Sequence, residues 1–98
     1  MFGPVLKAMS KKYPDQKDVV FFQGQGQYQG AAHYYKLAYT KQGYHITEVN
    51  QETLETLKPG QVVIVASSDL TGYLEDRFQT EVLYAYHASR VYRILEKK

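Results

Sequence analysis

Two short runs of consecutive apolar residues dominate the hydrophobic pattern of the chain. Residues 19–22 (VVFF) lie between Lys17-Asp18 and a glycine-rich segment, and residues 61–66 (QVVIVA), apolar from Val62 onward, follow a Pro-Gly pair. A short apolar run without alternation is typical of a strand that is buried on both faces of a sheet. We therefore predict that these two strands form the middle of a sheet.

The segments around these runs have other periodicities. Apolar residues recur at helical spacing in 5–12, in 31–42 and more weakly in 70–78, and Gly43 is expected as the left-handed residue that ends the second helix. Residues 44–49 alternate, which predicts a strand nearer the sheet edge. Asn50 is expected to cap a short helix over 51–57. Residues 81–86 and 90–95 predict an antiparallel hairpin with a turn at 87–89.

This order of elements predicts the fold class. Strands that alternate with helices favour right-handed crossovers and a mostly parallel sheet. The predicted fold is an α/β three-layer sandwich, Rossmann-like, with a mostly parallel five-stranded sheet and a C-terminal antiparallel hairpin. The strand 44–49 is expected on one side of the two buried strands, and the hairpin on the other. The 98 residues fit one α/β domain, 1–98.

Composition and charge exclude several classes of function. The chain has 12 Lys+Arg against 10 Asp+Glu, a net charge of +2, so we expect no nucleic-acid partner. The lysines at 7, 11, 12 and 17 are expected to form a solvated helix face. The absence of Cys excludes a disulfide scaffold, a Cys-ligated metal and a thiol nucleophile. No apolar run approaches the roughly 20 residues that span a bilayer, so the isolated domain is expected to be soluble.

The glycine-rich segment after the first buried strand is the first candidate site. Gly24 and Gly26 follow a strand and precede a helix, which is the context of a loop that binds a dinucleotide or a phosphate. The spacing, however, is Gly-x-Gly-x-x-x-Gly rather than Gly-x-Gly-x-x-Gly, and Gln25 and Gln27 are bulky for such a loop. A loop that binds a polar ligand, or one whose glycines only set the turn, is the favoured interpretation. We predict no cofactor.

The sequence Ser67-Ser68-Asp69 after the second apolar run is the second candidate. Open α/β sheets bind ligands at the carboxyl ends of strands, near the point where the strand order reverses. If the strands 19–22 and 61–65 are neighbours, residues 23–27 and 67–69 lie at one edge and form a polar crevice suited to a sugar or a phosphate. The alternative is that Ser67, Ser68 and Asp69 only cap the next helix.

The remaining polar residues predict neither a catalytic set nor a metal site. His33, His45 and His87 lack the spacing to a second ligand that a metal site requires, and are expected at or near the surface. Glu75 and Asp76 are adjacent, so on a helix they point in different directions and form no general acid/base pair.

Tyrosine is abundant, with 10 Tyr against 4 Phe. Tyr34 and Tyr35 belong to one helical stripe, and Tyr84 and Tyr86 belong to the hairpin. A tyrosine buries its ring and keeps its hydroxyl in water, which suits the boundary of a small core. It also suits an interface with a sugar, a lipid headgroup or another domain. These four tyrosines are therefore candidate interface residues.

Several segments together resemble a known family. They are KYPDQKDVVFF, AAHYYKLAY, GYHITEVNQETLETLKPGQVVIVASSD and RVYRILEKK. In this pattern, which covers nearly the whole chain, the sequence resembles the soluble C-terminal domain of bacterial dolichyl-phosphate-mannose-protein mannosyltransferase-like enzymes. These are multispanning GT-C glycosyltransferases that depend on lipid-phosphate sugars.

The resemblance implies a non-catalytic accessory domain, excised from a larger membrane protein, on the extracytoplasmic (periplasmic) face of the bacterial inner membrane. The catalytic Asp of such enzymes lies in a loop near their N-terminal helices, so no residue here is carried over as catalytic. The implied partners are the membrane portion of the same protein and a sugar or lipid-linked acceptor. Two alternatives stay open: a free-standing Rossmann-like domain that binds a nucleotide or sugar-phosphate through the loop 24–30, and a protein–protein interaction module.

Overall fold

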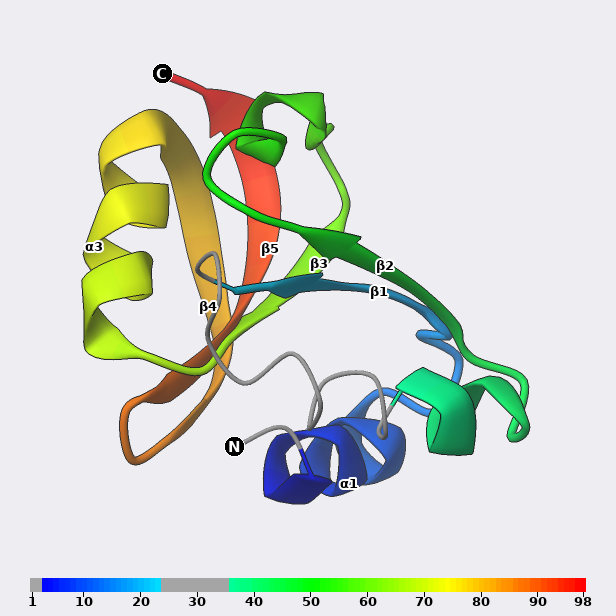
Figure 1. Ribbon diagram of the computed structural model, residues 1–98. Helices are drawn as coiled ribbons and strands as arrows, with labels where there is room; N and C mark the ends of the chain where they lie inside the picture. Colours follow the sequence, from blue (N-terminus) through cyan, green and yellow to red (C-terminus); the bar gives the residue numbers. More distant parts are fainter. Residues whose placement is uncertain (1–2, 24–35) are drawn as a thin grey trace.

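The two apolar runs form neighbouring strands of one sheet in the computed structural model, which describes residues 3–23 and 36–98 (Figure 1). β1 (Asp18–Phe22) pairs in parallel with β3 (Val62–Val65). Both strands have neighbours on both sides, and each of their apolar residues is buried. The prediction that these strands form the inner part of the sheet is confirmed.

The sheet has five strands in the order β2-β1-β3-β5-β4. β2 (His45–Val49) lies parallel to β1 at one edge, as expected, and the hairpin of β4 (Phe78–Tyr86) and β5 (Ser89–Lys97) forms the other side. The expectation of a mostly parallel sheet is wrong, because β5 runs antiparallel to both β3 and β4. The sheet is mixed, and it does not establish a Rossmann-like fold.

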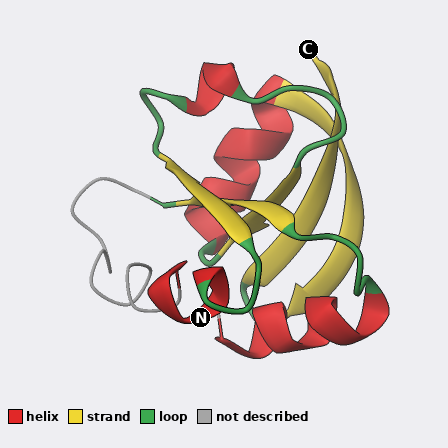
Figure 2. Ribbon diagram, turned by 90° about the vertical axis from the view of Figure 1, so that its right-hand side faces the viewer, coloured by secondary structure: helices red, strands yellow, loops and turns green. Residues whose placement is uncertain are grey.

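Helices cover both faces of the sheet, so alternate strand residues pack into two clusters (Figures 1 and 2). On one face, α1 (Gly3–Lys12) places Val5, Leu6 and Met9 in what we call the α1 cluster. On the opposite face, the 3-10 helix η1 (Leu54–Thr56) and α3 (Ser68–Arg77) contribute Leu54 and other leucines to the α3 cluster. Phe21 and Phe22, adjacent in β1, point into different clusters.

The helical segment at 36–40 ends as its sequence predicts. Gly43 has φ +93°, the left-handed conformation that glycine adopts without strain. The amide of Tyr44 donates to the carbonyl of Tyr39 at 3.0 Å, and that of Gly43 donates to Thr40 at 3.1 Å, which together form a Schellman motif. The rings of Tyr39 and Tyr44 meet edge to face at 5.3 Å and complete the motif.

The helix expected over 51–57 is shorter than predicted. Asn50 does cap this segment, since its Oδ1 accepts the backbone N–H groups of Glu52 and Thr53 at 2.8 and 3.0 Å. Only a turn and η1 follow, and the backbone is already extended at Leu57, one residue before the position that Pro59 restricts. Leu54 and Leu57 are buried in the α3 cluster, so one turn is enough to cover this part of the sheet.

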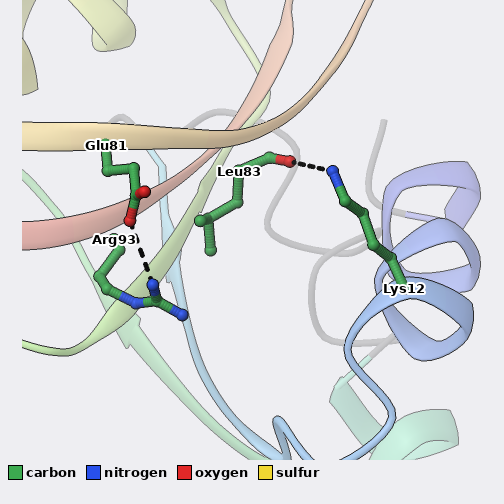
Figure 3. A network of polar contacts seen from close by, with 4 residues as sticks. All are labelled: Lys12, Glu81, Leu83 and Arg93. Carbon is green, nitrogen blue, oxygen red and sulfur yellow. Dashed lines mark hydrogen bonds and ion pairs between the residues drawn. The ribbon is translucent and has the colours of Figure 1, made fainter.

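The outer strand β4 is irregular at Leu83. The register with β5 shifts between Val82 and Tyr84, so Leu83 has no register partner on β5. The Nζ of Lys12 donates to the carbonyl oxygen of Leu83 at 3.2 Å, and nearby Arg93 and Glu81 form a cross-strand ion pair (Figure 3). A bulge and a lysine at a sheet edge both hinder pairing with a further strand.

Candidate functional site

The carboxyl ends of β1 and β3 lie side by side. Phe22 and Val65 are register partners, so Gln23 and Ala66, which follow them, begin two loops at the same edge. The loop after β3 enters α3 on one face of the sheet, whereas the β1–β2 connection returns through Tyr39 on the other face. This divergence is the switch point at which open α/β sheets bind ligands. The structure therefore provides the neighbouring strands that the predicted crevice requires.

Gln23 places an amide side chain at this edge. Its backbone N–H donates to the carbonyl of Val49 at 3.1 Å, which extends the β1–β2 pairing by one residue. Its side-chain Oε1 is buried without a hydrogen-bond partner. A buried acceptor left unpaired costs about 1–3 kcal/mol. This oxygen is covered by protein atoms, so a ligand can meet only the exposed part of the half-buried Gln23 side chain.

Ser67, Ser68 and Asp69 lie at the start of α3. The Oγ of Ser67 accepts the backbone N–H of Leu70 at 3.4 Å, so the predicted alternative of a helix cap is confirmed for this residue. Ser68 and Asp69 are exposed. The carboxylate of Asp69 lies in the first turn, where it interacts favourably with the helix dipole. The same negative charge makes this edge less suited to a phosphate than to neutral hydroxyl groups.

Several predicted residues lie outside the part of the chain that the structure describes. These are Gly24, Gln25, Gly26 and Gln27 of the glycine-rich loop, and Tyr34 and Tyr35 of the proposed interface.

The other two interface candidates, Tyr84 and Tyr86, lie half-buried on β4. They pack against the α1 cluster, as do Tyr13 and Tyr39. The aromatic rings therefore form a rim around α1 and its cluster.

A hollow that the sequence analysis does not predict lies at the amino ends of β1, β2 and β3. This cleft has a volume of about 410 Å³ and is lined by Asp18, His45, Thr47, Gln61 and their neighbours. The Nδ1 of His45 lies 3.3 Å from the Oδ1 of Asp18, with both side chains more than four-fifths exposed. An ion pair so open to water contributes little energy. The signal in the sequence is a polar residue at the start of each of two neighbouring parallel strands.

Tyr92 on β5 carries the most perturbed titratable group that we identify. Burial raises the pKa of Tyr92 above its usual range, and a hydrogen bond to Glu75 raises the pKa further. The hydroxyl donates to Oε2 of Glu75 on α3. Neither residue lines the cleft at the amino ends, so the contact ties α3 to the sheet and has a structural role.

Within residues 3–23 and 36–98, no three His, Cys, Asp or Glu side chains gather where they could hold a metal ion. None of the helices in that part of the chain has the length and apolar character needed to cross a membrane.

Comparison of the chain with protein-family models, with curated proteins and with solved structures gives no match.

Proposed function

We propose that this chain is a non-catalytic accessory domain of a mannosyltransferase-like membrane glycosyltransferase that depends on lipid-phosphate sugars. In this proposal it lies on the extracytoplasmic side of the membrane and packs on the membrane portion of the same protein. It contacts a sugar-bearing acceptor at the carboxyl ends of β1 and β3. The sequence resemblance supports the proposal, and its segments cover the end of α1 through β1, β2 through the start of α3, and β5.

The observation that carries the acceptor contact is the polar edge at the switch point. Gln23 offers a half-buried amide side chain, and Ser68 offers an exposed hydroxyl. Sugar hydroxyls both donate and accept hydrogen bonds, so they match an amide and a hydroxyl group together. Small-molecule sites commonly combine a few such polar groups with apolar walls.

Charge favours a neutral sugar over the alternative of a nucleotide or sugar-phosphate. A phosphate placed at the start of α3 would gain from the helix dipole but would meet the carboxylate of Asp69 in the first turn. The two effects oppose each other. A neutral pyranose lacks this repulsion and can still use the hydroxyl and amide groups of Ser68 and Gln23.

A titration followed by amide NMR tests the proposal. The ¹⁵N-labelled chain is titrated with methyl α-mannopyranoside and, separately, with mannose 1-phosphate. We expect shifts centred on Gln23 and residues 67–69, with weaker binding of the phosphate. Gln23→Leu and Ser68→Ala should weaken binding, and neither removes the cap that Ser67 provides.

Thr47→Ala, in the cleft at the other end of the strands, is the matched control and should bind as the wild type does. Shifts centred on that cleft, or no shifts with either ligand, would contradict the acceptor contact. Tighter binding of the 1-phosphate would instead support the nucleotide or sugar-phosphate alternative.

A further inference from the structure

The charged side chains are segregated between the two helical layers. Residues 1–47, which include α1 and the helical segment at 36–40, contain six lysines and only two aspartates. Residues 48–77, which include η1 and α3, contain six acidic residues and only two basic ones. A net charge of +2 for the whole chain therefore conceals one basic and one acidic side. We call the first the α1 layer.

The lysines of the α1 layer lie on a common side of the molecule. α1 and the segment at 36–40 pack on the same face of the sheet, because Tyr39 belongs with Val5, Leu6 and Met9 in the α1 cluster. Figures 1 and 2 both show the two helical segments next to each other. Six positive charges are thus gathered on α1, on the loop after it and on the helical segment (Lys7, Lys11, Lys12, Lys17, Lys36 and Lys41).

Two of these lysines point directly outward. Lys7 and Lys11 are one helical turn apart and exposed, on the side of α1 opposite the buried Val5, Leu6 and Met9. α1 has no acidic residue in its first turn, and Lys11 and Lys12 lie in its last turn. Lys12 contacts the edge of the sheet at Leu83, so Lys7 and Lys11 are the lysines of α1 best placed to meet a partner.

Tyrosines lie among these lysines. Tyr13, Tyr39, Tyr84 and Tyr86 are half-buried around the α1 cluster. The Nζ of Lys12 lies 5.4 Å from the ring centroid of Tyr13, and the Nζ of Lys17 lies 4.4 Å from that of Tyr44. Amphipathic rings beside long cationic side chains are the combination found at the headgroup level of membranes.

We propose that the α1 layer is a docking surface for the anionic headgroups of a lipid bilayer. All six cations of this layer are lysines, whereas the three arginines belong to α3 and β5 (Arg77, Arg90 and Arg93), and Arg93, the one near Lys12, is paired with Glu81 (Figure 3). Arginine is the residue that suits bidentate recognition of nucleic-acid bases and carboxylates, and lysine is depleted from protein–protein interfaces. Clustered lysines suit diffuse attraction to anionic lipids. This inference goes beyond the proposed function and does not depend on the chain belonging to a glycosyltransferase.

Partitioning onto vesicles tests the inference. The full chain is mixed with vesicles of phosphatidylcholine alone, or with vesicles in which one quarter of the lipid is phosphatidylglycerol, and bound protein is measured by sedimentation. We expect binding to the anionic vesicles only, weakened as salt is added. A lysine near such a surface contributes about fivefold, so Lys7→Gln with Lys11→Gln should weaken binding roughly 25-fold.

The matched control is Lys58→Gln with Lys98→Gln, which changes the net charge equally but lies outside the α1 layer. It should retain most of the binding. All four side chains are exposed, so both double variants should unfold as the wild type does, which circular dichroism checks. Equal losses in the two variants, or equal binding to phosphatidylcholine alone, would overturn the inference. So would tighter binding to a DNA duplex at the same ionic strength.

Discussion

Replacing Tyr92 by phenylalanine should remove one buried hydrogen bond and leave the packing of the core unchanged. Tyr92 is 1% exposed, and its ring lies in the α3 cluster. Its hydroxyl donates to the carboxylate of Glu75, one of the side-chain contacts between α3 and the sheet. The substitution therefore separates the hydroxyl from the apolar burial of the ring.

The magnitude follows from the kind of bond that is lost. A hydrogen bond to a charged group contributes about 1.5–3 kcal/mol, and the exposure of Glu75 moves the value toward the lower limit. We expect Tyr92→Phe to lower the free energy of unfolding at pH 7 by about 1.5 kcal/mol. For a domain of this size, that corresponds to a fall in Tm of roughly 6–12 °C.

The pH dependence gives the sharper test. Burial and Glu75 raise the pKa of Tyr92 in the folded chain, whereas in the unfolded chain this tyrosine ionises near pH 10 (its ordinary value). The stabilisation is complete below about pH 10. Above it, the unfolded chain releases a proton that the folded chain keeps, so stability falls by about 1.4 kcal/mol per pH unit. Tyr92→Phe lacks this loss, so its deficit should shrink as the pH rises.

Urea denaturation of the two proteins at several pH values from 7 to 11 measures both effects. Glu75→Ala removes the same bond from the other side, and the double variant should cost less than the sum of the two single variants. A constant difference between wild type and Tyr92→Phe across this range would refute the reasoning. A loss below about 0.5 kcal/mol at pH 7 would also refute it, because it would mean that the bond to Glu75 contributes almost nothing.

Two further predictions concern the backbone and the sheet edge. Gly43→Ala should lower the free energy of unfolding by about 1–2 kcal/mol, because φ at this position is +93°. Gly72→Ala, in α3 and with equal space around its Cα, should raise the free energy of unfolding by about 0.5–1 kcal/mol. Equal effects of the two substitutions in thermal denaturation would contradict this. Lys12→Met removes the contact with Leu83 and should promote concentration-dependent association through β4. Sedimentation velocity measures this association, with Lys11→Met as a control that should associate no more than the wild type does. The same monomer fraction in both variants would refute the prediction.

The inner strands β1 and β3 could be predicted because their burial on both faces is reflected in short runs of apolar residues. β1 and β3 are apolar at every inner position, as strands covered on both faces must be. The direction of β5 was not predictable in the same way, since it depends on which hairpin strand pairs with β3. Both hairpin segments are rich in apolar residues, so only the structure shows that β5, with Val91, Tyr92 and Ile94 buried, is the inner strand.

In the candidate site, too, local features could be predicted from the sequence and long-range ones could not. The cap formed by Ser67 involves residues three apart, so the sequence alone was enough to anticipate it. The buried amide oxygen of Gln23 and the meeting of Asp18 with His45 depend on how distant strands align. The uneven distribution of charged residues is visible in the sequence. Only the structure shows that the two helical layers that carry them lie on opposite faces of the sheet.

We propose that this sequence works as one domain of a larger membrane glycosyltransferase. The most direct measurement uses an antibody raised against the purified chain to probe membrane and soluble fractions of the cells that express the native gene. The proposal predicts a polypeptide several times longer than 98 residues, found in the membrane fraction and released only by detergent. A single reactive polypeptide of about this length in the soluble fraction would contradict it.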